Sequence, residues 1–202
     1  SAVEGMVLLK NNGALPFNDI NKVALFGNCS YEFIAGGTGS GNVNRAYTVS
    51  LLEGMKNAGL KTDDSMQAEY AQHIAYAKTQ VKEPEGPMAR FLSAPLPKEK
   101  VYDDDRLAAI AESNDVAVVT IGRLSGEFVD RKLSDFNLSD EETALLHKVC
   151  DVFHAKNKKV VVLLNIGGVI ETASWKNLPD AILLTWQAGQ EGGNSVADIL
   201  TG

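Results

Sequence analysis

Four short apolar runs alternate along the chain with segments of helical periodicity. Each run is rich in Val, Ile and Leu, lacks polar alternation and ends near a glycine or a polar turn. Such runs are typical of parallel strands that are buried on both faces. We therefore expect strands at KVALFG (22–27), DVAVVTIG (115–122), KKVVVLLNIG (158–167) and DAILLTW (180–186).

The helical segments lie between these runs. The clearest spans 138–159, where Ser139 and Glu142 form a capping-box pattern ahead of an apolar stripe. A final helix is expected to start near Glu191. Alternation of strands and helices predicts an α/β domain with a mostly parallel sheet. The other expected helices are the opening segment (1–10), 48–59, 65–80 and 104–115, and 83–100 reads as a long loop.

Composition narrows the possible partners. The 202 residues are 45% hydrophobic and carry a net charge of −7, and no Lys/Arg cluster interrupts the acidic balance. Nucleic acid and anionic membrane surfaces are therefore poor partner candidates, and no apolar run approaches the ~20 residues of a membrane span. We expect a single domain over residues 1–202, and the opening residues read like an internal part of a longer protein.

Metal and cofactor sites are not indicated. Cys29 and Cys150 are far apart and the three histidines have no ligand spacing, so we expect two free thiols, no metal and no cofactor. Two thiols do not fix the compartment, and localisation stays open.

A glycine-rich segment, AGGTGSGNVN (35–44), is the first candidate site. It matches neither the P-loop pattern nor the dinucleotide-binding pattern, and it starts about nine residues after the strand. Two interpretations remain at this stage. One is a flexible surface loop. The other is a ligand-binding loop in which Gly39 and Gly41, without side chains, let a ligand approach the backbone beside Ser40.

The second candidate is Glu127, in SGEFVDRK (125–132), just after the 115–122 run. Most loop glutamates are simply solvated. However, ligands of open α/β sheets bind beyond the carboxyl ends of the strands, which makes Glu127 the best candidate acid in the chain. Asp130 and Arg131 are expected to pair with each other and brace this loop.

Together these segments resemble the second domain of family-3 glycoside hydrolases, the β-glucosidase family. EGMVLLKNNGALPF resembles the entry segment of that domain, and KVALFG resembles its first strand. GGTGSGNV is similar to its glycine-serine substrate loop, SGEFVDRK to its acid/base loop, and TWQAGQEGG to its A-W-x-x-G-Q-E-G-G signature. Each motif alone is weak, but five in order over about 200 residues are specific.

The resemblance implies an α/β sandwich with a six-stranded sheet, packed beside a (β/α)₈-type barrel that carries the nucleophilic Asp. It maps the general acid/base onto Glu127 and a sugar-hydroxyl contact onto Ser40. The partner carboxylate is then absent from this chain, so the isolated domain is expected to be inactive. One departure from the family pattern is Phe128, where Gly is usual.

The function expected from the resemblance is that of a retaining, exo-acting β-glycosidase, with a β-linked sugar as substrate and the barrel domain as partner. The alternative is a non-catalytic carbohydrate-binding or scaffolding domain of the same fold. A nucleotide-binding domain is a third possibility, which the failed phosphate motifs disfavour. The sugar and the linkage stay open, because their contacts are expected on the barrel.

Overall fold

The computed structural model describes residues 2–87, 89, 92–127 and 130–202. These residues form a six-stranded sheet in the order β1-β6-β5-β4-β2-β3. Strands β2 to β6 run parallel, and β1 pairs antiparallel with β6 at one edge. The strands are β1 (Val7–Asn11), β2 (Lys22–Phe26), β3 (Lys61–Thr62), β4 (Val116–Arg123), β5 (Lys159–Ile166) and β6 (Ala181–Leu184).

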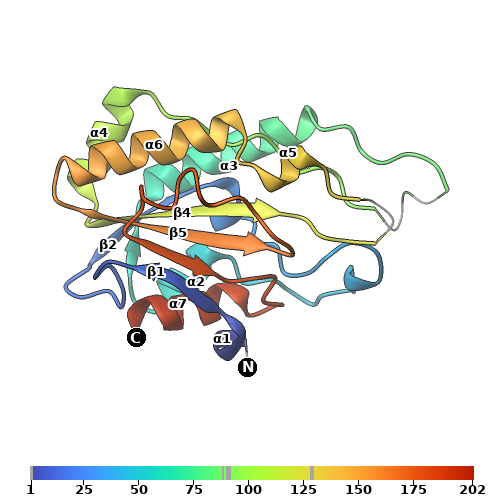
Figure 1. Ribbon diagram of the computed structural model, residues 1–202, viewed down its shortest axis with the longest axis horizontal. Coiled ribbons are helices and arrows are strands. Elements are labelled where there is room, and N and C mark those ends of the chain that lie inside the picture. The colour runs from blue at the N-terminus through green and yellow to red at the C-terminus, as the bar shows by residue number, and fades with distance from the viewer. Residues whose placement is uncertain (1, 88, 90–91, 128–129) are drawn as a thin grey trace.

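Helices cover both faces of this sheet, as Figure 1 shows. On one face lie α3 (Asp64–Thr79), α4 (Asp104–Ser113) and α6 (Asp140–His154), with the short α5 (Leu133–Phe136) beside them. On the other face lie α1 (Ala2–Gly5), α2 (Leu51–Asn57) and α7 (Gly192–Thr201). The mostly parallel α/β domain expected from the alternating pattern is therefore confirmed, as is the six-stranded α/β sandwich that the family resemblance implied.

The core consists of two apolar layers, one on each side of the sheet. Successive residues of a strand point to opposite faces. In β5, Val160 and Val162 accordingly pack with Phe153 under α6, whereas Val161 and Leu163 pack on the α2 and α7 side. These four residues of β5 are all fully buried. This explains why the run has no polar alternation.

Capping residues fix where the helices begin. Ser139 accepts a hydrogen bond from the Glu142 backbone N–H, and the Glu142 side chain returns to the Ser139 N–H, so the predicted capping box is present. Ser50 and Glu53 form a second capping box at the start of α2. The last helix starts at Gly192, with Glu191 as its N-cap, as expected.

The opening segment differs from its expected helix. Only Ala2–Gly5 is helical, and Val7–Asn11 instead form β1 against β6. The open edge of β6 offers unpaired backbone groups, and pairing with them outweighs a weak local preference for helix. Local periodicity contains no information about that edge. The prediction of a helix through Val7 was therefore wrong.

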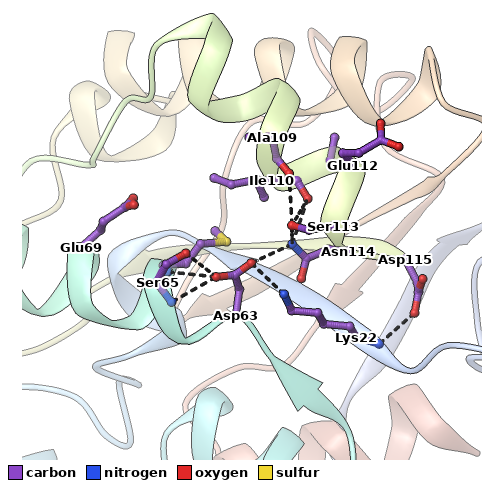
Figure 2. A network of polar contacts seen from close by, with 12 residues as sticks. Lys22, Asp63, Ser65, Glu69, Ala109, Ile110, Glu112, Ser113, Asn114 and Asp115 are labelled. Carbon is purple, nitrogen blue, oxygen red and sulfur yellow. Dashed lines mark hydrogen bonds and ion pairs between the residues drawn. The ribbon is translucent and has the colours of Figure 1, made fainter.

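A polar network ties the elements together at the amino ends of β2 and β4 (Figure 2). Asp63, the N-cap of α3, accepts hydrogen bonds from Lys22 Nζ and Asn114 Nδ2, each at 3.1 Å, and from the Ser65 backbone N–H. Burial opposes ionisation of Asp63, but these hydrogen bonds outweigh it and lower the pKa of its carboxyl. The groups that donate to Asp63 all belong to this domain, so we assign the network a structural role.

Candidate active site at the carboxyl edge of the sheet

The parallel strands β2, β4, β5 and β6 all end at one edge of the sheet, and the candidate residues lie on the loops that follow them. The glycine loop (residues 35–44) follows β2 after a short 3-10 turn at Asn28–Ser30. The β4 loop is the segment 124–132, of which residues 128 and 129, and hence Phe128, lie outside the described residues. Loops at this edge are where open α/β sheets bind ligands.

The glycine loop and the β4 loop are joined through Thr38 and Ser125. The Ser125 carbonyl accepts hydrogen bonds from the Thr38 backbone N–H at 2.8 Å and from its Oγ1 at 3.1 Å. Gly126 permits this approach, because a Cβ at that position would lie 1.2 Å from Thr38 Oγ1. The two loops therefore hold each other at a spacing that only a glycine allows.

Ser40 and Glu127 meet directly at this junction. Glu127 Oε2 accepts the Ser40 backbone N–H at 2.8 Å, and its Oε1 accepts the Ser40 hydroxyl at 2.8 Å. The Ser40 backbone N–H, followed by its hydroxyl, lowers the pKa of the Glu127 carboxyl below its ordinary value. Both residues are exposed. In this domain Glu127 is thus an ionised carboxylate that faces solvent in a defined position.

Gly39 packs closely against the side chain of Glu127. Its φ is +66°, in the left-handed region, and an added Cβ would lie 2.5 Å from Glu127 Oε2 and 2.8 Å from Glu127 Cβ. Gly41 is different, since a Cβ there would meet no described atom within 4 Å. Of the two glycines that flank Ser40, Gly39 is the one that makes room for Glu127.

Asn165 supports this edge from within. It is fully buried at the end of β5, and its Oδ1 accepts the Ile34 N–H at 2.7 Å. Its Nδ2 donates to the Ile34 carbonyl at 2.9 Å and to the Trp186 carbonyl at 2.8 Å. Trp186 has a φ of 54°, which is rare for a bulky residue. Asn165 therefore anchors both the approach to the glycine loop and the segment after β6.

A third contact connects the β4 loop to the segment after β6. Ser125 Oγ donates to Gln187 Oε1 at 3.2 Å. Gly167, just after β5, packs under this pair, because a Cβ there would lie 2.1 Å from Ser125 Oγ. The sequence analysis did not single out Asn165, Ser125 or Gln187. A lone Asn within the apolar run of β5 was the available signal for the first of them.

Arg131 braces the β4 loop, but not through Asp130. Its Nη1 donates to the Val169 carbonyl and its Nη2 to the Asp135 carbonyl, each at 2.7 Å. In the described part of the chain no ion pair joins Arg131 to Asp130, so the expected pairing is corrected. Backbone carbonyls of α5 and of the segment after β5 are fixed acceptors, whereas Asp130 is exposed and solvated.

A buried ion pair lies behind the β4 loop. Arg123, the last residue of β4, donates to Glu142 Oε1 at 2.6 Å and to its Oε2 at 2.7 Å. Side-chain exposure is 11% for Arg123 and 8% for Glu142, so water screens this bidentate pair only weakly. Since Glu142 also caps α6, the pair connects the end of β4 to the start of that helix.

Other chemistry is limited in the described residues. They contain no group of three or more His, Cys, Asp or Glu side chains arranged to hold a metal ion. Cys29 and Cys150 are free and buried, and burial raises the pKa of both thiols. No described helix has both the length and the apolar content that a bilayer crossing requires. The acidic and hydroxyl groups at the carboxyl edge are therefore the candidates for chemistry.

Comparison with known proteins identifies the domain. The profile of the glycosyl hydrolase family 3 C-terminal domain matches residues 6–202. This chain belongs to that family. The Beta-glucosidase of Ruminococcus albus is 35% identical over 204 residues, covering 98% of this chain and 20% of that protein. Beta-glucosidase A of Butyrivibrio fibrisolvens is 32% identical over 233 residues, covering 100% of this chain and 26% of that protein.

Solved structures agree with this assignment. The structure of beta-glucosidase 3B from Thermotoga neapolitana in complex with alpha-D-glucose matches with a TM-score of 0.91 and 45% identity. The match covers 100% of this chain and 28% of that one. The family 3 domain described here thus spans between 20% and 28% of the length of these relatives.

Proposed function

We propose that this family 3 domain supplies the general acid/base, Glu127, to a retaining, exo-acting β-glycosidase of the β-glucosidase type. The observation that carries the proposal is the position of the Glu127 carboxylate. It lies at the carboxyl edge of the sheet, is held there by Ser40 and Gly39, and faces solvent. No cation neutralises it within the described part of the chain, so it is available to a substrate.

A retaining glycosidase needs two carboxyl groups roughly 5–5.5 Å apart, one as nucleophile and one as acid/base. In this proposal Glu127 is the second, and a (β/α)₈-type barrel domain joined to this chain supplies the nucleophilic Asp. The greater length of the relatives supports such a partner domain. The 202-residue chain alone should then have no glycosidase activity.

The acid must be protonated in the first step, whereas Ser40 stabilises its ionised form. Both requirements are met if the sugar takes over the Ser40 hydroxyl. A sugar hydroxyl that accepts from Ser40 Oγ removes one of the two hydrogen bonds to Glu127. Desolvation under the barrel and the substrate then raises the pKa of Glu127 further. Ser40 in this way couples sugar binding to protonation of the acid.

The substrate proposed is a terminal β-linked sugar of an oligosaccharide or glucoside. The names of the relatives support a glucoside, and the contacts that select one sugar are expected on the barrel. The non-catalytic alternative is disfavoured because Ser40, Gly39 and Glu127 occur together in one arrangement at the carboxyl edge of the sheet.

The decisive variant is Glu127→Ala in a protein that joins this chain to its barrel. Cellobiose-like substrates have a poor leaving group, so their cleavage should fall by about 10²–10⁴-fold. A dinitrophenyl glucoside departs without a proton, so its first step should be nearly unchanged and a glycosyl-enzyme should accumulate. Added azide, which needs no general base, should restore turnover as a β-glycosyl azide.

Glu171→Ala is the matched control, because Glu171 is a half-buried glutamate whose carboxylate is likewise held by the backbone N–H and the hydroxyl of one serine. It should leave both substrates unaffected. Equal losses on both substrates for Glu127→Ala, without azide rescue, would assign Glu127 a structural role and favour the non-catalytic alternative.

A further inference from the structure

Asn12 and Gly13 form an exposed turn directly after the edge strand β1. Asn11 pairs with Ala181, the first residue of β6, so this turn lies at the amino edge of the parallel strands, opposite the candidate active site. The Asn12 N–H donates to the Asp180 carbonyl at 2.8 Å. Within the described residues the contacts of Asn12 are made by its backbone alone, so its carboxamide is free to rotate.

The backbone of Gly13 leaves room for that carboxamide to approach. Its φ is +71°, and an added Cβ would meet no described atom within 4 Å. The N–H groups of Ala14 and Leu15 both donate to Asn11 Oδ1, at 3.0 Å and 3.1 Å. The Gly13 N–H, in contrast, has no acceptor in the part of the chain that the structure describes. An N–H that makes no hydrogen bond loses its proton more readily, because no bond has to be broken first.

Lys159 favours the loss of this proton. Its Nζ lies 3.4 Å from the Asn12 carbonyl oxygen, which belongs to the same planar peptide group as the Gly13 nitrogen. Resonance places part of the charge of the deprotonated amide on that oxygen, and a nearby cation stabilises the charged form of a group. Asp180 also binds Nζ, at 2.9 Å, and offsets part of this effect.

We propose that Asn12 is a site of spontaneous deamidation. The deprotonated nitrogen of Gly13 attacks Cγ of Asn12, and the new C–N bond closes a succinimide ring. The carboxamide C–N bond breaks, and its nitrogen leaves as ammonia after taking up the proton that Gly13 lost. Water then adds to one of the two ring carbonyls and opens the ring, which leaves aspartate or isoaspartate at position 12. Water is the only co-reactant, and the site is independent of the proposed function.

The two products should differ in their effect on β1. In isoaspartate the backbone runs through Cβ and Cγ, so the turn gains one carbon atom. The hydrogen bonds from Ala14 and Leu15 to Asn11 span this turn and should therefore weaken. Aspartate adds a carboxylate but keeps the length of the backbone. We therefore expect isoaspartate to destabilise the chain and aspartate to leave its stability nearly unchanged.

Ageing of the 202-residue chain at mildly alkaline pH tests the proposal. Trypsin releases Asn12 within the peptide 11–22, and mass spectrometry with electron-transfer fragmentation distinguishes asparagine, aspartate and isoaspartate at that position. Both products should accumulate at Asn12, and the rate should rise with pH because the reacting nitrogen must lose a proton. A residue 12 that stays asparagine throughout would overturn the proposal.

Asn57 is the internal control, in the tryptic peptide 57–61. It is exposed at the end of α2 and is followed by the small Ala58. However, its Nδ2 donates to Asn194 Oδ1 at 2.9 Å, and the Ala58 N–H donates to the Gly54 carbonyl at 3.0 Å. Deamidation at Asn12 should be about tenfold faster or more, because both reacting groups are free there and glycine has no Cβ to hinder ring closure.

Gly13→Ala should slow deamidation at Asn12 by about tenfold, because the added methyl group hinders ring closure. The methyl group meets no described atom, and a cooperative urea transition would show that the variant is folded. Equal rates at Asn12 and Asn57, or in the native chain and Gly13→Ala, would overturn the proposal. Asn12→Asp supplies the charge without the extra carbon. Its urea midpoint should match that of the fresh chain, whereas the isoaspartate fraction, isolated by ion exchange, should unfold at lower urea.

Discussion

Ser40 and Glu127 are 87 residues apart in the chain, yet Ser40 holds both carboxylate oxygens of Glu127, one through its backbone N–H and one through its hydroxyl. The two hydrogen bonds fix the direction of the carboxylate and stabilise its charge. The residue that the family resemblance assigns to the sugar is thus also the residue that sets the resting state of the proposed acid.

Ser40→Ala should raise the pKa of Glu127, but not to its ordinary value. The variant removes the hydroxyl, whereas the Ser40 backbone N–H, which is the larger cause of the lowered pKa, remains. The measurement is a ¹³C NMR titration of the Glu127 side-chain carboxyl in the 202-residue chain.

Ser174→Ala provides the control, since Ser174 holds Glu171 through the same two groups. It should raise the pKa of Glu171 and leave that of Glu127 unchanged. An unaltered Glu127 titration in Ser40→Ala would mean that the hydroxyl bond is not formed in solution.

Gly39→Ala should disturb Glu127 more than Ser40→Ala does. The new methyl group would overlap the Glu127 side chain, and alanine is strained at a φ of +66°. Both hydrogen bonds from Ser40 should then weaken, and the pKa of Glu127 should approach that of a free glutamate in the same titration.

Gly41→Ala is the control for Gly39→Ala. It makes the same glycine-to-alanine change two residues away, where an added Cβ has no described atom within 4 Å. Its Glu127 titration should resemble that of the unaltered chain. If Gly39→Ala and Gly41→Ala gave the same titration, the close packing of Gly39 on Glu127 would be excluded.

Much of the fold could be predicted from the sequence because its signals are local. Doubly buried strands leave uninterrupted apolar runs, as in 158–167, and the capping box of α6 needs only Ser139 and Glu142. The edge strand β1 has no such signal: Val7 and Leu8 are exposed, and their pairing depends on β6, far along the chain. Local patterns do not contain that contact.

The candidate site was predicted only as separate parts. The position of a loop after a strand indicated Glu127, and glycine spacing indicated the loop of Ser40, but no spacing rule connects residues 87 apart. Arg131 shows the same limit. An adjacent Asp130 suggested an ion pair, whereas the carbonyls that Arg131 binds belong to residues brought near it by folding.

Glu99 should make the stability of the chain depend on pH between about 5 and 8. Its pKa is raised from 4.5 to about 8 in the folded chain, chiefly by burial. The folded state therefore holds a proton that the unfolded state has already lost above pH 5. Stability is fully present below pH 4.5, falls as the pH rises toward 8, and is constant again once both states are ionised.

Glu99→Gln removes this titration while keeping an acceptor for the Asn28 N–H. The free energy of unfolding of the native chain, relative to that of the variant, should fall by about 1–3 kcal/mol between pH 5 and 8.5. The effect stays below that of a fully buried carboxyl because Glu99 is only partly buried. Urea unfolding at several pH values measures it.

Glu112→Gln is the control, because the pKa of Glu112 is shifted in the opposite direction to that of Glu99. Lys156 lowers the pKa of Glu112, so any stability it contributes is present above about pH 5 and is lost only as the pH falls further. Its curve should run parallel to that of the native chain from pH 5 to 8.5. If the Glu99→Gln curve is parallel as well, Glu99 is ionised in the folded chain at neutral pH.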